Sequence, residues 1–437
     1  MTTPIDELDS HLLGELTEFR RDLHSHPELG FQETRTAARV AAALRASGVD
    51  VTEGIGGTGL VGTIRGVGSG DGSIGLRADM DALSLVEETG LPYASRTHGL
   101  MHGCGHDGHT AVLLGAARRL AADRDFGGSV HVIFQPAEEG LGGASAMLDD
   151  GLFERFPCDA VYALHTAPGL PVGTISTGTG PIMAGGGTFD LTFTGTGGHG
   201  GQGAHLTPDL TVAQATYVMA LQTIVSRNVP ALETAVVSVG YVNGGRPDAP
   251  NVMPAELSLG GTLRCFSKDA QDLVAGRIHE LADTIAAAYG CSATARVTWI
   301  TTPLVNAPDQ VDIVARAARS VLGTENVFTD MAPITGGEDF ALMLEATPGA
   351  SSSWATAPRR TAPSTTSTAR TTTSTTRRSP PASRSGSASS VSSSPPKPCP
   401  ADSDVRHGAD ATRCRHIARN GDISHRATPA EGWKRAR

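Results

Sequence analysis

The chain has 437 residues with 39% hydrophobic and 4% aromatic content, enough apolar sequence for two soluble domains with separate cores. It shows neither a charged-then-apolar leader nor an apolar run of membrane-spanning length, and its six cysteines lack disulfide-like spacing, so we expect a cytoplasmic protein with no membrane partner. Charge divides the chain: residues 351–437 hold 15 basic and 5 acidic side chains, whereas residues 1–350 hold 20 and 40.

The first part of the chain alternates helical and strand-like periodicity. Apolar spacing predicts helices over 5–26, 34–47 and 110–124, and strands over 60–65, 73–77, 129–135 and 159–165. This order predicts a mostly parallel sheet sandwiched between helices. Polar residues follow three of the strands, namely Asp79 and Asp81, Glu138 and Glu139, and His165, at the sheet edge where α/β proteins usually carry their sites.

The most informative stretch is GCGHDGH at residues 103–109, which places Cys104, His106, Asp107 and His109 between glycines. Thiolate, imidazole and carboxylate side chains are ligands for divalent transition metals. A buried cysteine among polar loop residues is the plainer alternative, but the carboxylates and histidine further along favour an enzymatic metal site. A structural zinc site would show paired cysteine motifs, which are absent. His24 and His26 could be ligands; we favour a role in satisfying backbone groups near the site.

A second domain interrupts the first. Strands over 185–196, 234–241, 256–266 and 292–299, with helices over 208–227 and 270–289, give the order β-α-β-β-α-β of a ferredoxin-like α+β lid. The chain then returns through a helix over 308–322 and the acidic segment GGEDFALML. We expect a catalytic domain over 1–183 and 298–350, the lid over 184–297, and a tail over 351–437. The glycine-rich segments GIGGTG and GTGGHGG do not open a helix after a strand with an acidic residue at the expected distance. We therefore expect no nucleotide site at either segment.

These motifs resemble the aminoacylase/carboxypeptidase-type metallopeptidase superfamily, in its subgroup of N-acyl-amino-acid amidohydrolases, which includes hippurate and indole-acetyl-amino-acid hydrolases. The resemblance spans residues 19–340 in order. It is carried by RRDLHSHPELGFQE, GLRADMDAL, HGCGHDGH, FQPAEEG, ALHTAPG, TGTGGHG, NVMP, GTLRCF and GGEDFA.

The resemblance implies the roles of the site residues. The implied ligands of two divalent metals, zinc or manganese, are Cys104, His106, Glu139 and His165. Glu138 would be the general base that takes a proton from water and passes it to the leaving amine, which agrees with the chemistry expected of a carboxylate beside a Lewis-acidic metal. Asp79 would orient a ligand; Arg77 stands before it where related enzymes have His.

In the lid, the resemblance implies that His199 reaches the substrate carbonyl and that Asn251 and Arg264 hold its free carboxylate, a role that suits the arginine fork. A structural role for Asn251 stays open. The implied partner is a small-molecule N-acyl amino acid, and a homodimer formed through the lid is compatible with the resemblance. Without aromatic interleaving, the basic tail is not expected to bind nucleic acid.

The C-terminus departs from the pattern. The family's motif resembling LHxPxYDFND, which supplies a further His ligand, is absent, and 25 of residues 351–400 are Ser or Thr, a composition typical of a disordered tail. Such a tail should follow a finished domain, whereas this one begins before the predicted domain is complete. A frame shift explains it better: with synonymous codons chosen freely, one shifted frame spells LVLGNG over 351–357 and LHSPHYDFNDEAIPPG over 366–382. The chain as written would then lack a His ligand, a sheet strand and its closing helix.

The sequence therefore predicts a metallo-amidohydrolase that cleaves the amide of N-acyl amino acids, impaired in this chain unless His109 or a tail histidine replaces the lost ligand. Two alternatives stay open. One is a non-catalytic protein that binds acyl amino acids, against which Glu138 argues because a binder has no use for a general base. The other is a carboxypeptidase or dipeptidase of the same superfamily, against which the Cys104 ligand argues.

Overall fold

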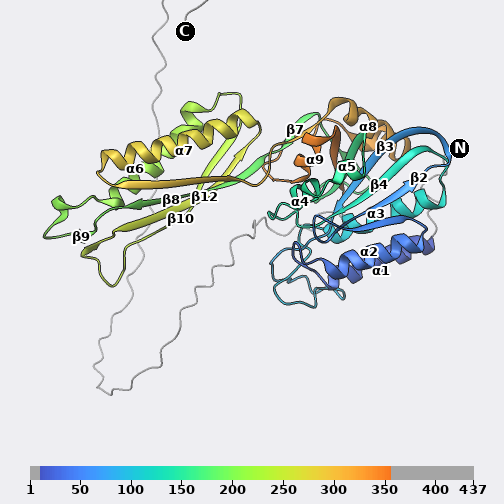
Figure 1. Ribbon diagram of the computed structural model, residues 1–437, viewed down its shortest axis with the longest axis horizontal. Helices are drawn as coiled ribbons and strands as arrows, with labels where there is room; N and C mark the ends of the chain where they lie inside the picture. The colour runs from blue at the N-terminus through green and yellow to red at the C-terminus, as the bar shows by residue number, and fades with distance from the viewer. Residues whose placement is uncertain (1–9, 356–437) are drawn as a thin grey trace, which may run out of the picture. The chain divides into compact units, whose positions relative to one another are not determined.

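The computed structural model describes residues 10–355, and the expectations for residues beyond 355 lie outside this range (Figure 1). Its larger sheet has eight strands in the order β1-β2-β4-β3-β5-β16-β6-β15. Their bounds are β1 Asp50–Ile55, β2 Gly59–Arg65, β3 Gly68–Asp79, β4 Gly127–Gln135, β5 Ala160–Ala167, β6 Ile175–Ser176, β15 Val327–Phe328 and β16 Gly349–Ala355. Strands β4, β3, β5 and β16 are parallel neighbours, whereas β1 and β2 join antiparallel. The α/β class is confirmed.

Helices cover both faces of this sheet, as its sequence predicts. Their bounds are α1 Ser10–Ser25, α2 Thr34–Ala46, α3 His106–Ala122, α4 Gly143–Asp149, α5 Leu152–Arg155, α8 Pro308–Leu322 and α9 Phe340–Ala346. In β4, Val132 and Phe134 pack in one core with α2 and α3, while Ile133 packs in the other with α4 and α9. A strand buried on both faces carries apolar residues at successive positions, as Val132, Ile133 and Phe134 do.

Strand β16 corrects one expectation. Residues 351–355 were expected to lie outside the sheet, but they pair in parallel with β5, with Ser351 opposite Ala163 and Ser353 opposite His165. The pairing uses backbone groups, so serine side chains do not prevent it. The Asn306 side chain also exchanges two 2.8 Å hydrogen bonds with the backbone of Ser351. The strand that we expected to be missing is therefore present, and it crosses the boundary placed at residue 350.

The lid elements form a separate antiparallel sheet in the order β10-β12-β8-β13, with two helices packed on it (Figure 1). Their bounds are β8 Gly185–Thr194, α6 Leu210–Thr223, β10 Ala235–Gly244, β12 Glu256–Cys265, α7 Lys268–Ala288 and β13 Ser292–Trp299. In chain order this is strand order 2-3-1-4, which confirms the ferredoxin-like topology. Two small sheets complete the strands: β7 Gly180–Met183 with β14 Leu304–Asn306, and β9 Gly198–His199 with β11 Val252–Met253.

None of the helices in the described part of the chain combines the length and the apolar character needed to cross a bilayer. The four cysteines within residues 10–355 are all free thiols.

Candidate metal centre

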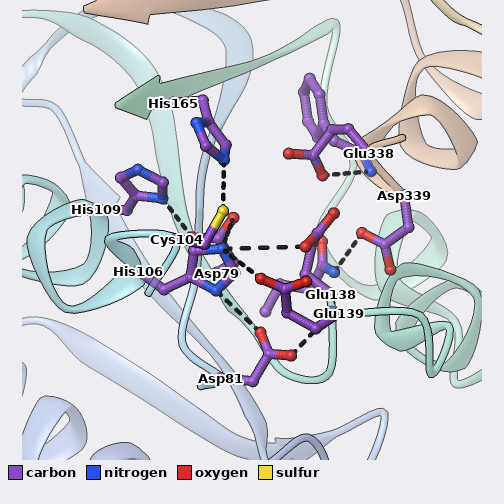
Figure 2. Close-up of polar contacts among 12 residues, drawn as sticks. Asp79, Asp81, Cys104, His106, His109, Glu138, Glu139, His165, Glu338 and Asp339 are labelled. Atoms are coloured by element: carbon purple, nitrogen blue, oxygen red, sulfur yellow. Dashed lines mark hydrogen bonds and ion pairs between the residues drawn. The ribbon is translucent and has the colours of Figure 1, made fainter. Parts of the chain in front are cut away.

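The predicted metal-site residues come together at the carboxyl edge of the parallel strands (Figure 2). Strand β3 ends at Asp79, β4 runs into the loop that carries Glu138 and Glu139, and β5 carries His165. The run containing Cys104 lies between the first two of these strands in the chain and begins helix α3. Each strand end thus delivers one part of the site, as expected for a parallel sheet.

Helix α3 begins inside the metal run rather than after it. It starts at His106, not at Thr110, and its N-cap is Gly105 with a φ of 92°. Glycine accepts this left-handed backbone, so the chain turns sharply between Cys104 and His106. His106 and His109 then lie three residues apart on one helical face, with ring centroids 5.3 Å apart. Gly105 at the cap and Gly108 in the first turn have low helix propensity, so propensity alone does not predict that the helix begins here.

The four predicted ligands converge. Cys104 Sγ lies 3.5 Å from His165 Nε2, and His106 Nε2 lies 3.9 Å from Glu139 Oε1. Ligand atoms of Cys104, His106 and His165 all fall within 4.8 Å of one another, and so do those of His106, Glu138 and Glu139. His106 Nε2 and Glu139 Oε1 are buried without a hydrogen-bond partner. Because unpaired buried polar atoms are costly, this pair fits a bound cation.

Asp81 orients two of these ligands. Its Oδ1 lies 3.2 Å from His106 Nδ1, and its Oδ2 accepts a 3.0 Å hydrogen bond from the Glu139 backbone N–H. Holding the second ring nitrogen fixes the tautomer that leaves His106 Nε2 free to bind a metal. From sequence alone, Asp81 was noted at the strand end without a role.

His109 is committed to other contacts. Its Nδ1 lies 2.6 Å from Asp79 Oδ1, and its Nε2 accepts a 2.9 Å hydrogen bond from the Thr166 backbone N–H. Burial lowers the pKa of His109 despite the Asp79 charge, so the ring stays neutral. With both ring nitrogens used, His109 in this arrangement buttresses Asp79 and has no free lone pair for a metal.

The histidines of the first helix do not join the centre. His24 bridges Asp107 Oδ2 at 2.9 Å and Glu87 Oε1 at 3.3 Å, and His26 Nδ1 lies 2.8 Å from the Asp22 carbonyl oxygen. Within residues 10–355, neither histidine belongs to a cluster with metal-ligand spacing. His26 thus contacts a backbone carbonyl, which is the role that the sequence favoured, whereas His24 pairs with two side-chain carboxylates instead.

The centre has two faces that differ in electrostatics. Cys104 and His165 form one face, and Glu138 and Glu139 form the other. Burial alone would lower the pKa of His165, but the neighbouring Cys104 raises it to about 9. Burial opposes ionisation of the Cys104 thiol, yet its contacts with His106 and His165 lower its pKa below the ordinary value. On the other face, burial raises the pKa of Glu138 well above its usual range, and the Glu338 charge raises it further. One face therefore favours a thiolate, and the other favours a carboxyl that can hold a proton.

The lid residues are partly brought together. His199 lies on β9 opposite Val252 of β11, and its Nε2 is 3.4 Å from Asn251 Nδ2. Arg264 lies on β12 and donates through Nε to the Thr335 carbonyl at 3.1 Å. Among the side chains of residues 10–355, no hydrogen bond joins Arg264 to His199 or Asn251.

Residues 75–366 match the family model described as peptidase family M20/M25/M40. The chain belongs to this family. It is therefore a hydrolase of the M20 metallo-amidohydrolase and peptidase type, which confirms the resemblance recognised in its motifs.

Relatives of this M20 chain extend over most of its length. It is 39% identical to the hippurate hydrolase of Campylobacter jejuni, over 76% of this chain and 86% of that protein. It is also 39% identical to the N-acetyl-L-cysteine deacetylase of Bacillus subtilis, over 80% and 82%. The crystal structure of the Bacillus subtilis YXEP protein, described as a dinuclear metal binding peptidase from the M20 family, matches with a TM-score of 0.69 and 33% identity, over 80% and 90%.

Proposed function

We propose that this M20 chain hydrolyses the amide bond of N-acyl amino acids, with Cys104, His106, Glu139 and His165 as ligands of a pair of divalent metals. The observation that carries the proposal is the convergence of buried, unpaired His106 Nε2 and Glu139 Oε1 beside the Cys104–His165 pair. The names of the relatives, a hippurate hydrolase and an N-acetyl-L-cysteine deacetylase, support N-acyl amino acids as the substrate class.

The ligand types suit zinc or manganese. The thiolate and imidazole ligands of one face favour zinc. The carboxylate and imidazole ligands of the other face suit manganese as well as they suit zinc. When bound, a divalent metal supplies Lewis acidity, which polarises the scissile carbonyl and makes water a better nucleophile.

Glu138 is the proposed proton carrier. Its Oε2 lies 4.0 Å from His106 Nε2, so it borders the ligand cluster without being needed in it. Because burial and neighbouring carboxylates raise its pKa, Glu138 holds a proton more readily than an ordinary carboxylate. It accepts the proton of the attacking water and then donates it to the amide nitrogen. The amino acid therefore leaves as a neutral amine rather than as an amide anion.

Asp79 is the proposed orienting residue, supported by its 2.6 Å contact with His109 and its 3.7 Å approach to His106 Nε2. In the lid, His199 would donate to the carbonyl oxygen as negative charge develops there, and Asn251 and Arg264 would bind the substrate carboxylate. The 3.4 Å approach of Asn251 to His199 supports a shared site for these two.

We also propose the domain limits expected from sequence: a catalytic domain over 1–183 and 298–350, a lid over 184–297 and a separate tail. Strand β16 extends the catalytic part to at least residue 355. A homodimer through the lid is supported by the edge strand β10, where Val236, Tyr241 and Val242 are exposed.

We retain the proposal that the sequence from about residue 351 is read out of frame and lacks a His ligand. Two groups on β16 support it: Ser352 Oγ and Trp354 Nε1 are buried without hydrogen-bond partners. Both residues line an apolar cavity of about 480 Å³, together with Leu76, Leu113 and Val314. Serine suits such a position poorly, whereas the shifted frame permits leucine and valine there.

The function is tested by assaying the purified chain, and a chain with its frame restored, with Zn²⁺ or Mn²⁺ on N-benzoylglycine and N-acetyl amino acids. Release of the free amino acid is expected from the restored chain, with a lower rate from the chain as written. Cleavage of dipeptides in preference to acyl amino acids would point to the peptidase alternative. Tight substrate binding without turnover in both chains would support a non-catalytic binding protein.

A further inference from the structure

Arg77 stands where the family resemblance implies a histidine, and it is almost completely buried, with 4% of its surface exposed. It lies on β3, two residues before Asp79. Its guanidinium donates to Asp79 Oδ2 and Gln135 Oε1, each at 2.8 Å, to Glu338 Oε1 at 2.9 Å and to Asp339 Oδ1 at 3.2 Å. Three carboxylates, one near Arg77 in the sequence and two more than 260 residues away, thus share one cation.

The partners of Arg77 are held in turn by the ends of other elements. Asp339 Oδ2 accepts a 2.9 Å hydrogen bond from the Ala144 N–H at the start of α4, and Asp339 Oδ1 accepts a 2.7 Å bond from Gln135 Nε2. Glu338 Oε1 accepts a 3.0 Å bond from the Phe340 N–H at the start of α9. The network therefore joins β3, the end of β4 and two helix starts around one guanidinium.

Two groups of this network face the metal centre (Figure 2). Asp79 lies 2.6 Å from His109 and 3.7 Å from His106 Nε2. Glu338 and Asp339 have carboxylate oxygens within 4.8 Å of one on Glu138, the proposed proton carrier. Arg77 thus contacts a carboxylate close to the metal-facing Nε2 of His106 and the residues beside the general base, without itself belonging to a cluster of metal ligands.

A planar guanidinium is suited to this position because its five N–H donors point outward in one plane and can bond several acceptors together. Lysine would keep the charge but not the fork, and a histidine has only two ring nitrogens. The buried carboxylates also need a permanent cation nearby, since removing one partner of a buried ion pair leaves an uncompensated charge.

We propose that Arg77 is a positioning residue: it clamps Asp79 to Glu338 and Asp339 and so sets the geometry of His106 and Glu138 for metal binding and proton transfer. The part about proton transfer rests on the hydrolysis proposed above, whereas the part about metal geometry rests only on the ligands proposed with it.

The test compares the full chain with Arg77→Lys and with the double variant Arg77→Met/Asp339→Asn. The double variant removes the guanidinium together with one of the carboxyl groups that it holds, so the clamp is lost without leaving all three carboxyl groups unpaired. Arg35→Lys is the matched control, because Arg35 makes two 2.8 Å contacts with Asp22 between α2 and α1 and touches none of the site residues. Each protein is titrated with Co²⁺, following the thiolate-to-cobalt absorption band that Cys104 would produce, and its folding is checked by circular dichroism.

Loss of an orienting partner typically weakens metal binding or activity by about 10–100-fold. We expect this rise in the Kd for Co²⁺, and an altered absorption spectrum, for both Arg77 variants, while they stay folded and the Arg35 control matches the original chain. If Arg77→Lys and the folded double variant both keep the Co²⁺ affinity and the spectrum of the original chain, the proposal is overturned. Unfolding of both variants would overturn it too, because Arg77 would then serve folding rather than ligand geometry.

The outcome separates this proposal from the proposed function. A chain that binds Co²⁺ but hydrolyses no acyl amino acid refutes the function, and the change in Kd still tests Arg77. A chain that binds no Co²⁺ refutes the positioning role directly, because no ligand geometry is then being maintained.

Discussion

His106 and Glu139 face each other across 3.9 Å with two buried atoms, Nε2 and Oε1, that have no hydrogen-bond partner. Asp81 holds both residues from behind, through the other ring nitrogen of His106 and the backbone N–H of Glu139. Such an arrangement costs free energy in a protein without metal and recovers it when a cation binds between the two atoms.

Metal should therefore stabilise the fold measurably. A ligand that binds only the native state at a thousand times its Kd stabilises by about 4 kcal/mol. We expect the thermal unfolding midpoint to fall after chelation and to recover when Zn²⁺ or Mn²⁺ is restored. The double variant His106→Ala/Glu139→Ala serves as the control and should show no shift. If the unfolding midpoint of the original chain does not change with chelator or added metal, the proposed centre is contradicted.

Metal affinity should rise with pH up to about 9. The pKa of His165 is raised to about 9 beside Cys104, so at neutral pH its ring carries a proton that a metal must displace. As pH falls below 9, this competing proton is bound more fully and affinity drops by up to tenfold per pH unit for each proton displaced. Calorimetry at pH 7.5 in buffers of different ionisation enthalpy should reveal proton release. Identical heats in all buffers would disprove it.

Glu138→Gln should abolish turnover while leaving metal binding intact. The amide keeps the shape but cannot carry the proton, and general acid–base catalysis typically contributes about 10²–10⁴-fold. We expect kcat to fall by that factor, measured on the frame-restored chain, with Co²⁺ affinity nearly unchanged. Glu88→Gln, at an exposed position, is the control. Retained activity in Glu138→Gln would remove Glu138 from the mechanism.

Ser352→Ala should stabilise the chain. The Ser352 hydroxyl is buried in an apolar cavity without a partner, and leaving such a group unsatisfied costs about 1–3 kcal/mol. Urea denaturation should therefore show a gain of about 1 kcal/mol in the free energy of unfolding. Ser353→Ala on the same strand should show no gain, because the Ser353 hydroxyl contacts Met331 Sδ at 3.8 Å. A loss of stability in Ser352→Ala would indicate an unseen partner for the hydroxyl.

Resequencing the coding DNA across codons 340–400 should reveal a single-base insertion or deletion near codon 350. Correcting it is expected to raise both the thermal midpoint and the hydrolytic activity, since the corrected frame supplies a histidine and apolar residues for β16. An unaltered frame, verified from independent DNA, would mean that the serine-rich sequence is the natural one.

The sequence by itself predicted the ligand types that we propose and determined much of the architecture. Cys104 and His106 are recognisable because ligands close in sequence are close in space, and Glu139 and His165 follow strands whose parallel order brings their ends to one edge. Strand and helix periodicity likewise predicted the lid, since its alternation and helical spacing are local properties.

Only the tertiary structure decided which polar side chains support the ligands. Arg77 and Glu338 are 261 residues apart, and no local pattern relates them. His109 has the same spacing signal as His106, yet Thr166 and Asp79 occupy both of its ring nitrogens. Strand β16 is serine-rich and lacks strand periodicity, but β5 and Asn306 supply its backbone partners. Hydrogen-bond partners are chosen by proximity in the folded chain, so these roles emerge only when segments distant in sequence pack together.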